Sequence, residues 1–554
     1  MADTMKGLKR THYCGTVTPE MIGREVVVCG WAQKTRDMGT LVFIDLRDRT
    51  GIVQLAFDDK TDPALLAKAQ KVRAEYVLMA RGVLRQRESV NHEIPTGEVE
   101  VYVTELRVLA ESNTPPFAIS DDSRGVKEDL RLKYRYLDLR RPEMQNAIAM
   151  RHRIVKIARD YYDTNGFYEI ETPILIKSTP EGARDYLVPS RVQQGRFYAL
   201  PQSPQLYKQI LMCSGFDRYM QIARCFRDED LRADRQPEFT QIDVEMSFID
   251  EEDIMAMNEG FMKRVFKEVL GKDLETPFRR IKYQDAMDNY GIDKPDTRFD
   301  LKLHDLSEIL KNTEFSVFSG AIAGGIAKFI NADEKTVEAV KSALSLEPNT
   351  LVFLSAGKRE EAQKTAGVMR RMLGAACEGH MDKERYEFCW IVDFPMYEIG
   401  EESGELEFCH NPFSMPSGGM ETLLKAERGE IDPLDILADQ YDLVCNGVEL
   451  SSGAVRNHDP EIMVKAFEMV RLGEDNVKAK FPAMYNAFCY GAPPHAGIAP
   501  GVDRMVMLLS GEESIREVIA FPMNKSAQDV MMDAPSKVTE AQLKELHIAV
   551  TEEE

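Results

Sequence analysis

The feature that most constrains this chain is a charged stretch at 227–243, set between two runs of alternating apolar residues at 219–226 and 239–246. The pattern predicts a strand, a charged loop and a second strand. Apolar side chains fill one face of the second strand, so we expect that face to be buried. The other face lies beside a loop that begins with arginine, and we expect it to hold a planar, anionic ligand. It carries Phe239, Gln241, Asp243 and Glu245.

The length and composition indicate a soluble protein of several domains. The 554 residues are 44% hydrophobic, which is enough for several cores. The nine cysteines form no CxxC pair and the histidines show no zinc spacing, which is typical of reduced cytoplasmic proteins. We find no signal peptide and no run of about 18 apolar residues, so we expect no membrane span.

The net charge of −22 argues against indiscriminate binding of nucleic acid. The charge is uneven, however, because residues 1–107 contain 16 Lys and Arg against 15 Asp and Glu. A nearly neutral N-terminal module can bind nucleic acid through local contacts.

This N-terminal module has the pattern of an OB-fold, a five-stranded barrel that often binds single-stranded nucleic acid. A generic small β-barrel is the alternative. A helix-like segment at 63–73 follows the third of five β runs, which are 26–31, 41–46, 51–57, 76–84 and 98–108.

A second informative segment, 441–451, predicts a hairpin with a turn at Asn446-Gly447. In that register Val444 pairs with Glu449 and Asp442 pairs with Ser451. Asp442 and Glu449 then share one face as diagonal neighbours. Two such carboxylates suit Mg²⁺ held together with substrate phosphates, although two solvated acids on an edge strand fit the pattern equally well.

Two later arginines need further explanation. Strict alternation puts Arg456 on the wrong face of the hairpin, so a bulge at 452–453 is expected. Arg504 follows a glycine-rich turn at 497–504 and enters the first turn of an apolar helix at 505–509. A cation there opposes the helix dipole, and a bound phosphate explains it better than stability does.

Two segments upstream of the charged stretch also carry polar groups. Residues 178–186 form a loop that looks mobile. In the segment 201–208, Ser203 can cap a helix that displays Gln205 and Lys208, although a plain serine-capped helix explains this segment in isolation.

These segments together resemble class II aminoacyl-tRNA synthetases. Residues 226–229 with Phe239 resemble motif 2, residues 501–504 resemble motif 3, and a helix from 141 to about 165, followed by a strand at 167–173, resembles the dimer-forming motif 1. More narrowly, the chain is similar to bacterial-type aspartyl-tRNA synthetases over three segments, which are 132–142, 180–191 and 227–243.

The resemblance implies a multidomain α+β fold with an OB-fold barrel, an antiparallel catalytic sheet flanked by helices, and an inserted α/β (GAD-like) domain with helices near 334–344 and 360–373. The insertion looks shorter than usual: its later part, from 325–329 onward, matches, and an earlier β portion is missing. The expected boundaries are 1–107 for the anticodon-binding domain, 108–140 for a hinge, 141–286 and 386–526 for the catalytic domain, 287–385 for the insertion and 527–554 for a C-terminal extension.

The implied reaction joins L-aspartate and ATP into aspartyl-adenylate and then transfers the aspartyl group to tRNA-Asp. It needs positioning and charge neutralisation rather than a protein nucleophile. The implied catalytic residues are Arg227 on the α-phosphate, Glu229 beside adenine and Arg504 on the γ-phosphate. Phe239 would stack on adenine. The implied ATP site is Arg227, Asp228, Glu229, Gln236, Phe239, Glu449, Gly501, Val502, Asp503 and Arg504, with Mg²⁺ on Asp442 and Glu449.

For aspartate, the resemblance assigns Lys208 and Arg456 to the side-chain carboxylate, a pair that disfavours asparagine. Asp243 either orients this clamp or faces the ammonium group. The implied aspartate site is Glu181, Ser203, Gln205, Lys208, Arg227, Gln241, Asp243, His410 and Arg456.

The anticodon positions that the resemblance implies are Arg36, Phe43, Gln54, Arg87, Asn91 and Glu100. By pattern alone, Phe43 fits the barrel core as well as a base-stacking platform. A non-discriminating enzyme that also charges tRNA-Asn is one alternative; Met38 lies where such enzymes vary, but a methionine there favours neither interpretation. The others are an asparaginyl-tRNA synthetase, a tRNA-independent ligase and a non-catalytic nucleic-acid-binding relative. The resemblance also implies a homodimer formed through motif 1.

Overall fold

The computed structural model describes residues 2–119, 125–179, 182–310, 334–348, 350–377, 381–382, 384–400 and 403–551. The chain divides into two compact units, 1–149 with 520–536 and 150–519 with 537–554. Among the described residues no helix has both the length and the apolar character needed to cross a bilayer.

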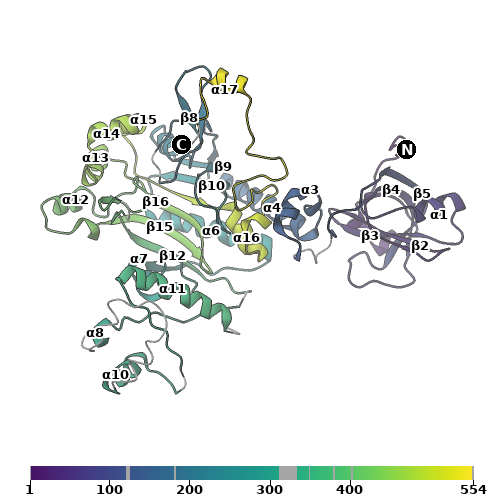
Figure 1. Ribbon diagram of the computed structural model, residues 1–554, viewed down its shortest axis with the longest axis horizontal. Coiled ribbons are helices and arrows are strands. Elements are labelled where there is room, and N and C mark those ends of the chain that lie inside the picture. The colour runs from purple at the N-terminus through teal and green to yellow at the C-terminus, as the bar shows by residue number, and fades with distance from the viewer. Residues whose placement is uncertain are drawn as a thin grey trace. The chain divides into compact units, whose positions relative to one another are not determined.

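The N-terminal unit contains a closed five-stranded barrel with the strand order β1-β2-β3-β5-β4, which confirms the predicted OB-fold (Figure 1). Alternate side chains point into one apolar core, as the period of a strand requires. The helix after the third strand begins at Pro63, where the Asp62 carboxylate accepts hydrogen bonds from two backbone N–H groups. The elements are β1 (Glu25–Asp37), β2 (Val42–Asp48), β3 (Gly51–Phe57), α1 (Pro63–Gln70), β4 (Val77–Gln86) and β5 (Val99–Ala110).

The second unit is built on one eight-stranded sheet with the order β11-β12-β15-β16-β17-β10-β9-β6. Its six central strands are antiparallel, as predicted, and only the edge strands β11 and β6 pair in parallel. The strands are β6 (Tyr168–Glu169), β9 (Arg218–Phe226), β10 (Glu238–Ser247), β11 (Arg279–Lys282), β12 (Phe388–Pro395), β15 (Leu437–Cys445), β16 (Val448–Val455) and β17 (His495–Pro500).

Helices flank this sheet, as expected, and two of them carry site residues (Figure 1). The predicted motif 1 helix is α4 (Pro142–Thr164), but the strand predicted at 167–173 contains only two residues, β6. α6 begins at a capping box on Asp250 and ends at Gly271 in the left-handed conformation. The site-bearing helices are α5 (Gln205–Cys213) and α16 (Val502–Ser510), and α6 spans Glu251–Leu270.

The insertion is attached to the sheet through α7 (Tyr283–Tyr290), which packs against α11 (Arg359–Ala376) (Figure 1). Two glycines allow the backbones to touch, since a Cβ on Gly291 would lie 2.2 Å from the Gln363 carbonyl oxygen and one on Gly367 would lie 2.7 Å from that of Gly291. The two helices predicted in the insertion are confirmed as α10 (Glu334–Leu344) and α11, whereas 325–329 lies outside the described residues.

The remaining elements belong neither to the barrel strands nor to the main sheet. They are α2 (Glu128–Lys133), α3 (Arg135–Asp138), β7 (Leu187–Pro189), β8 (Phe197–Ala199), α8 (Ser307–Leu310), β13 (Tyr397–Ile399), β14 (Leu406–Phe408), α12 (Gly419–Glu427), α13 (Pro460–Met469), α14 (Glu474–Lys480), α15 (Pro482–Cys489) and α17 (Glu540–Leu546), with short 3₁₀ turns at Cys14–Thr16, Pro19–Met21, Pro433–Asp435 and Ile515–Glu517.

Candidate active site

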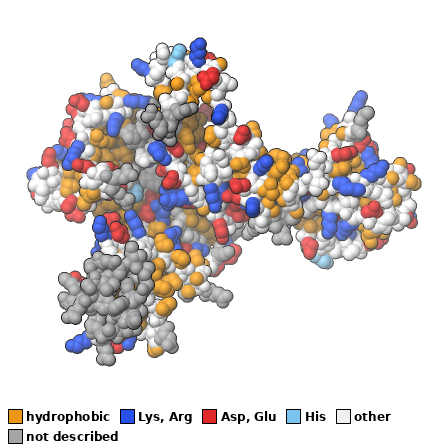
Figure 2. Space-filling view, viewed as in Figure 1, with side chains coloured by type: hydrophobic (Ala, Val, Ile, Leu, Met, Phe, Trp, Pro, Cys, Tyr) orange, Lys and Arg blue, Asp and Glu red, His pale blue; other side chains and the backbone are white. Residues whose placement is uncertain are grey.

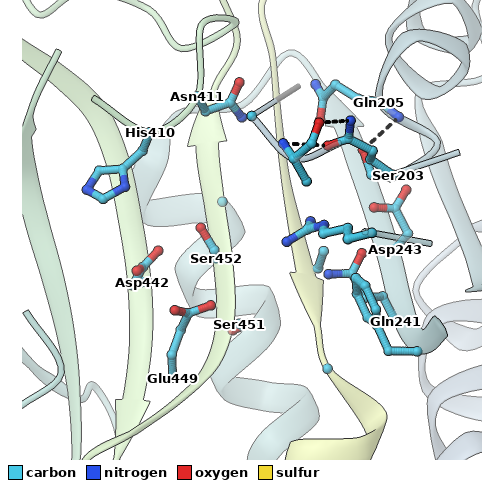
Figure 3. A pocket seen from close by; sticks show the side chains of 18 of the residues that line it. Ser203, Gln205, Gln241, Asp243, His410, Asn411, Asp442, Glu449, Ser451 and Ser452 are labelled. Carbon is cyan, nitrogen blue, oxygen red and sulfur yellow. Dashed lines mark hydrogen bonds between the residues drawn. The ribbon is translucent and has the colours of Figure 1, made fainter. Parts of the chain in front are cut away.

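A cavity of about 490 Å³ opens over the central strands of the large sheet. Figure 3 shows His410, Asp442 and Glu449 along one side, and Ser203, Gln205, Gln241 and Asp243 along the other. The predicted residues that line it together are Ser203, Gln205, Lys208, Arg227, Glu229, Gln236, Phe239, Gln241, Asp243, His410, Asp442, Glu449, Arg456, Gly501, Asp503 and Arg504.

Three predicted residues are not part of this lining. Val502 is fully buried in the core, and Asp228 pairs through its backbone with Arg184. Glu181 lies outside the described residues, although its neighbours Gly182 and Ala183 do line the cavity.

At one end of the cavity, Lys208 and Arg456 are held by two buried carboxylates. Lys208 Nζ lies 2.7 Å from Asp243 Oδ1 and 3.3 Å from Glu245 Oε2. Arg456 donates from Nε and Nη2 to the two oxygens of Glu245, at 2.8 and 3.2 Å. Arg456 Nη1 makes no hydrogen bond to a described residue, so it is available to an anionic ligand.

Glu245 was expected on the ligand-facing side of its strand, but the sequence interpretation gave it no role in this site. It lies on the predicted polar face of β10, but its partner Arg456 directly follows β16, two strands away in the sheet. Gly497 of β17 lies between them, and a Cβ there would be 1.8 Å from Glu245 Oε2. The expected glycine-rich turn at 497–504 is therefore wrong over its first half. Residues 495–500 form a central strand, in which Gly497 makes room for a protein carboxylate rather than for a ligand.

The two carboxylates titrate in opposite directions. Burial alone raises the pKa of Glu245, but Arg456 and Lys208 outweigh it and hold that pKa below its ordinary value. Burial raises the pKa of Asp243, and Lys208 offsets this only in part. Asp243 Oδ2 is buried with no hydrogen-bond partner among the described residues. One oxygen of Asp243 thus holds Lys208 while the other is left for a donor, so both roles considered for this residue are compatible with its geometry.

A chain of amides connects the cavity to a buried histidine. Gln205 Nε2 donates to Gln209 Oε1 at 2.9 Å, and Gln209 Nε2 lies 3.1 Å from His495 Nε2. Because the amide nitrogen must donate, His495 Nε2 accepts, and its Nδ1 donates to Pro493 O at 2.8 Å. Burial lowers the pKa of His495 to about 4, so the ring is neutral at pH 7. Ser203 Oγ accepts a hydrogen bond from the backbone N–H of Gln205, the first residue of α5, at 3.3 Å.

The acidic hairpin forms, with one change of register. Val444 pairs with Glu449 as predicted, but Asp442 pairs with Ser452 rather than Ser451. The ladder shifts between Leu443 and Val444, so the extra residue is Leu450 and not 452–453 as expected. A bulge at either place turns Arg456 to the face of Asp442, which is why the face was predicted correctly and the position of the bulge was not.

Asp442 and Glu449 fit a divalent cation by their chemistry. Burial and the neighbouring Glu449 raise the pKa of Asp442 to about 8, whereas Arg504 and Lys294 counter the burial of Glu449 and lower its pKa. The two carboxylates, Asp442 buried and Glu449 half-buried, cannot both ionise easily, and they form a set of oxygen donors suited to Mg²⁺. Within the described residues there is no group of three or more His, Cys, Asp or Glu placed to hold a metal, so the remaining ligands would come from substrate or water.

The middle of the cavity is formed by motif 2-like residues. The guanidinium of Arg227 lies over the ring of Phe239, 5.0 Å from its centre, and Arg227 Nε is buried without a partner in the described part of the chain. Glu229 pairs with Arg235 at 3.2 Å. A planar cation beside an aromatic face suits a nucleotide.

Arg504 closes this side of the cavity from the first turn of α16. Its Nη1 lies 3.2 Å from Glu449 Oε1 and its Nη2 lies 3.2 Å from Asp234 Oδ2. Asp503 turns back to the protein instead, where it accepts from Thr240 N at 3.0 Å and pairs with Arg151. Of these two neighbours, Arg504 is the one whose partners lie at the cavity wall.

His410 and Lys294 complete the wall opposite the clamp. His410 is open to the cavity but enclosed by protein elsewhere, with Phe394 edge-on at 5.2 Å, and this burial lowers its pKa. Lys294, which the sequence interpretation also missed, lies 3.3 Å from Glu449 Oε2 and 2.6 Å from Asp293 Oδ2. No local pattern points to it, since it lies in a loop that follows α7.

The predicted anticodon residues fall on the barrel and its β4–β5 loop, and three of them join in a hydrogen-bonded row. Arg36 Nη2 donates to Gln54 Oε1 at 2.8 Å, and Gln54 Nε2 donates to Glu100 Oε2 at 2.7 Å. Phe43 is half-buried beneath Arg36 and is not part of the apolar core. This position excludes the barrel-core alternative and leaves the base-stacking role as a prediction. Arg87 and Asn91 are half-buried near the end of β4 and in the loop that follows. On the side shown in Figure 2, basic and acidic side chains are intermixed.

An antiparallel sheet with a nucleotide-type cavity, in the same chain as an OB-fold, defines a class II aminoacyl-tRNA synthetase architecture. A family model described as tRNA synthetases class II (D, K and N) matches residues 127–525, and one described as an OB-fold nucleic acid binding domain matches residues 26–109. The chain belongs to the family of class II tRNA synthetases (D, K and N).

Two curated relatives illustrate the similarity. The chain is 47% identical over 597 aligned residues to an aspartate–tRNA(Asp/Asn) ligase of Caldanaerobacter subterraneus subsp. tengcongensis, covering 99% of this chain and 100% of the relative. It is 46% identical to an aspartate–tRNA ligase of Macrococcus caseolyticus, covering 97% and 98%.

Solved structures share the fold at lower identity. An asparaginyl-tRNA synthetase of Pyrococcus horikoshii, complexed with asparaginyl-adenylate, aligns with a TM-score of 0.62 at 20% identity and covers 93% of this chain and 98% of its own. An aspartyl-tRNA synthetase of Entamoeba histolytica aligns with a TM-score of 0.61 at 21% identity, covering 93% and 92%.

Proposed function

We propose that this protein is an aspartate–tRNA ligase, which forms aspartyl-adenylate and pyrophosphate from L-aspartate and ATP and then transfers the aspartyl group to the terminal 3′-hydroxyl of tRNA-Asp. The observation that carries the proposal is the buried pair of Lys208 and Arg456 at the closed end of the cavity, in a chain 46–47% identical over its length to aspartate–tRNA ligases. Arg456 is fixed by Glu245 and presents Nη1, and a second carboxylate suits this site better than a neutral amide does.

The proposed roles follow the order of groups along the cavity. Lys208 and Arg456 bind the side chain of aspartate, and Asp243 Oδ2 with Gln205 and Gln241 binds its ammonium group. The α-carboxylate then points toward the α-phosphate, which Arg227 neutralises. An oxygen of the aspartate α-carboxylate attacks the α-phosphorus and forms the acyl–phosphate bond. The bond from the α-phosphorus to pyrophosphate breaks, and no protein nucleophile is needed. Phe239 stacks on adenine and Glu229 binds its edge.

Mg²⁺ is the proposed metal, and Asp442 with Glu449 would hold it together with the phosphates of ATP. When bound it would neutralise charge on the phosphates. Arg504, which already contacts Glu449, would bind the γ-phosphate from the side of α16.

Aminoacylation of purified tRNA-Asp and tRNA-Asn, measured side by side, tests the proposal. Charging of tRNA-Asp with aspartate is the expected result, and failure with both tRNAs would refute the function. The two relatives carry different names, one for tRNA(Asp/Asn) and one for aspartate–tRNA ligase alone, so charging of tRNA-Asn with aspartate would identify a non-discriminating enzyme. Charging with asparagine instead would identify an asparaginyl-tRNA synthetase.

We further propose that two copies pair through the motif 1 region, in the cytoplasm. β6 is an edge strand of only two residues, and apolar side chains are exposed around it. A substitution Tyr168→Glu should shift the sedimentation coefficient toward the monomer, whereas Tyr490→Glu, at an exposed tyrosine elsewhere, should not. A wild-type protein that sediments as a monomer would contradict pairing. The exposed apolar side chains around β6 are Tyr168, Ile174, Leu175 and Phe216.

The proposed cytoplasmic location agrees with the state of the thiols. All nine cysteines are free, which suits a reducing compartment.

A further inference from the structure

Lys294 is a cation in the cavity wall for which the proposed roles give no task. Its Nζ lies 3.3 Å from Glu449 Oε2, and the other oxygen of Glu449 lies 3.2 Å from Arg504 Nη1. One carboxylate therefore lies between the two cations. The lysine thus reaches the end of the cavity where the polyphosphate of ATP would lie, far along the chain from motifs 2 and 3.

The loop that carries Lys294 is held firmly from the side of the insertion. It begins at Gly291, whose backbone touches α11, and Arg370 of α11 donates from Nη2 to Asp296 O and Phe299 O, both at 2.9 Å. The carboxylate of Asp296 is in turn occupied by Arg298. These contacts fix the backbone on both sides of Lys294, so its ion pair with Glu449 is not needed to hold the loop.

The simpler explanation for Lys294 is a structural ion pair. Asp293, its neighbour in the chain, already lies 2.6 Å from Nζ and would satisfy the lysine at the surface. The side chain also reaches Glu449 and lines the cavity together with His410 and Asp442, while 30% of it stays accessible. A pair that served only stability would gain little from an ammonium group open to a ligand site.

Charge at this end of the cavity indicates what the lysine binds. The polyphosphate of ATP would enter a region that already contains Asp442 and Glu449, so cations beyond Arg227 and Arg504 would lower the cost of binding it. Lysine is a common point charge for β- and γ-phosphates. We propose that Lys294 binds the β- and γ-phosphates of ATP, and hence the pyrophosphate that leaves. This inference rests on the proposed function.

Nucleotide binding without aspartate, where no turnover occurs, tests the inference by calorimetry at saturating Mg²⁺. The probes are ATP, which carries the β- and γ-phosphates, and AMP, which lacks them. For Lys294→Met we expect ATP affinity to fall by about tenfold or more and AMP affinity to change by less than about twofold, the scale of one charge-assisted contact. Lys294→Arg, which keeps the charge, should recover most of the ATP affinity. Lys302→Met, an exposed lysine later on the same connection, is the matched control and should bind both nucleotides normally.

Three results would overturn the inference. Equal losses for ATP and AMP would show a structural role. Unchanged ATP affinity would show that no contact exists. Tighter Mg²⁺ binding with normal ATP affinity would show that Lys294 only neutralises Glu449.

Aspartate-dependent ATP–pyrophosphate exchange by the wild type distinguishes a failure of the role of Lys294 from a failure of the proposed function. If the wild type exchanges and Lys294→Met keeps a normal ratio of ATP to AMP affinity, only the role of Lys294 fails. If the wild type does not exchange, the proposed function itself fails.

Discussion

Glu245 holds Arg456 by both carboxylate oxygens, at 2.8 and 3.2 Å, across a strand whose only contribution at that point is the backbone of Gly497. This geometry sets the direction of the arginine before any ligand arrives. If the proposed function holds, the amino-acid specificity of the cavity depends on a residue that is not part of its lining.

We expect Glu245→Gln to raise the KM for aspartate by about 100-fold while the KM for ATP changes little, because breaking a buried ion pair costs about 3–5 kcal/mol. ATP–pyrophosphate exchange at varied aspartate and at varied ATP measures both constants. Glu238→Gln makes the same change on the same strand, where Glu238 pairs with Arg224 at the surface, and it should leave both constants unchanged. Equal increases in the two constants would show that Glu245 supports the fold rather than the clamp.

Arg504→Ala should lower the rate of ATP–pyrophosphate exchange by about 100-fold or more, the usual effect of losing one charge-stabilising group. The exposed Arg471, which pairs with Glu405, provides a matched control, and Arg471→Ala should be neutral. Near-normal exchange by Arg504→Ala would remove this residue from the nucleotide site.

Binding of Mg²⁺ should release a proton. Burial and Glu449 raise the pKa of Asp442 to about 8, so at pH 7 the acidic pair holds about one proton that the metal must displace. Affinity for Mg²⁺ should therefore rise with pH toward about 8 and level off above it. Calorimetry in two buffers of different ionisation enthalpy measures the protons released. Asp442→Asn should abolish the release at pH 7, and a wild type that releases none would contradict the coupling of the pair.

His495 should make the protein less stable in mild acid. Its folded pKa of about 4 lies below the ordinary value of 6.5, so its neutral form supports folding fully above about pH 6.5, and this support is lost as the pH falls toward 4. The full loss is on the order of 3 kcal/mol. Denaturant midpoints of His495→Gln should therefore fall less steeply than those of the wild type between pH 6.5 and 4. Parallel curves would show that the histidine does not titrate on unfolding.

Phe43→Ala should reduce kcat/KM for tRNA by about tenfold or more without changing ATP–pyrophosphate exchange, since loss of one base-stacking ring costs about 1–3 kcal/mol. Phe43→Trp keeps an aromatic face and should retain most of the activity. A loss of exchange activity in Phe43→Ala would show damage beyond the barrel.

Local patterns in the sequence predicted the elements better than the contacts between them. The five barrel strands, the Asn446-Gly447 turn and the strands on either side of 227–237 all follow from alternation and turn chemistry. The bulge at Leu450 could not be located, because any single extra residue before Arg456 produces the same change of face.

Glu245 and Lys294 show what the sequence could not reveal. Glu245 was placed on the correct face of its strand, but its pairing with Arg456 depends on the order of strands in the sheet. Lys294 depends on a loop whose path is set by α11, about 75 residues later in the chain. Neither residue belongs to a motif with a fixed spacing, so only tertiary structure brings each one to the site.

The glycine contact between α7 and α11 also bears on how this family can vary in length. Two backbones are in direct contact at Gly291 and Gly367 and form a fixed joint, and α8 and α10 belong to the stretch of chain between these two glycines. This chain has 554 residues, yet its alignment to a full-length relative extends over 597 positions. Segments gained or lost beyond the joint can change the size of the insertion while the loop that enters the cavity keeps its place.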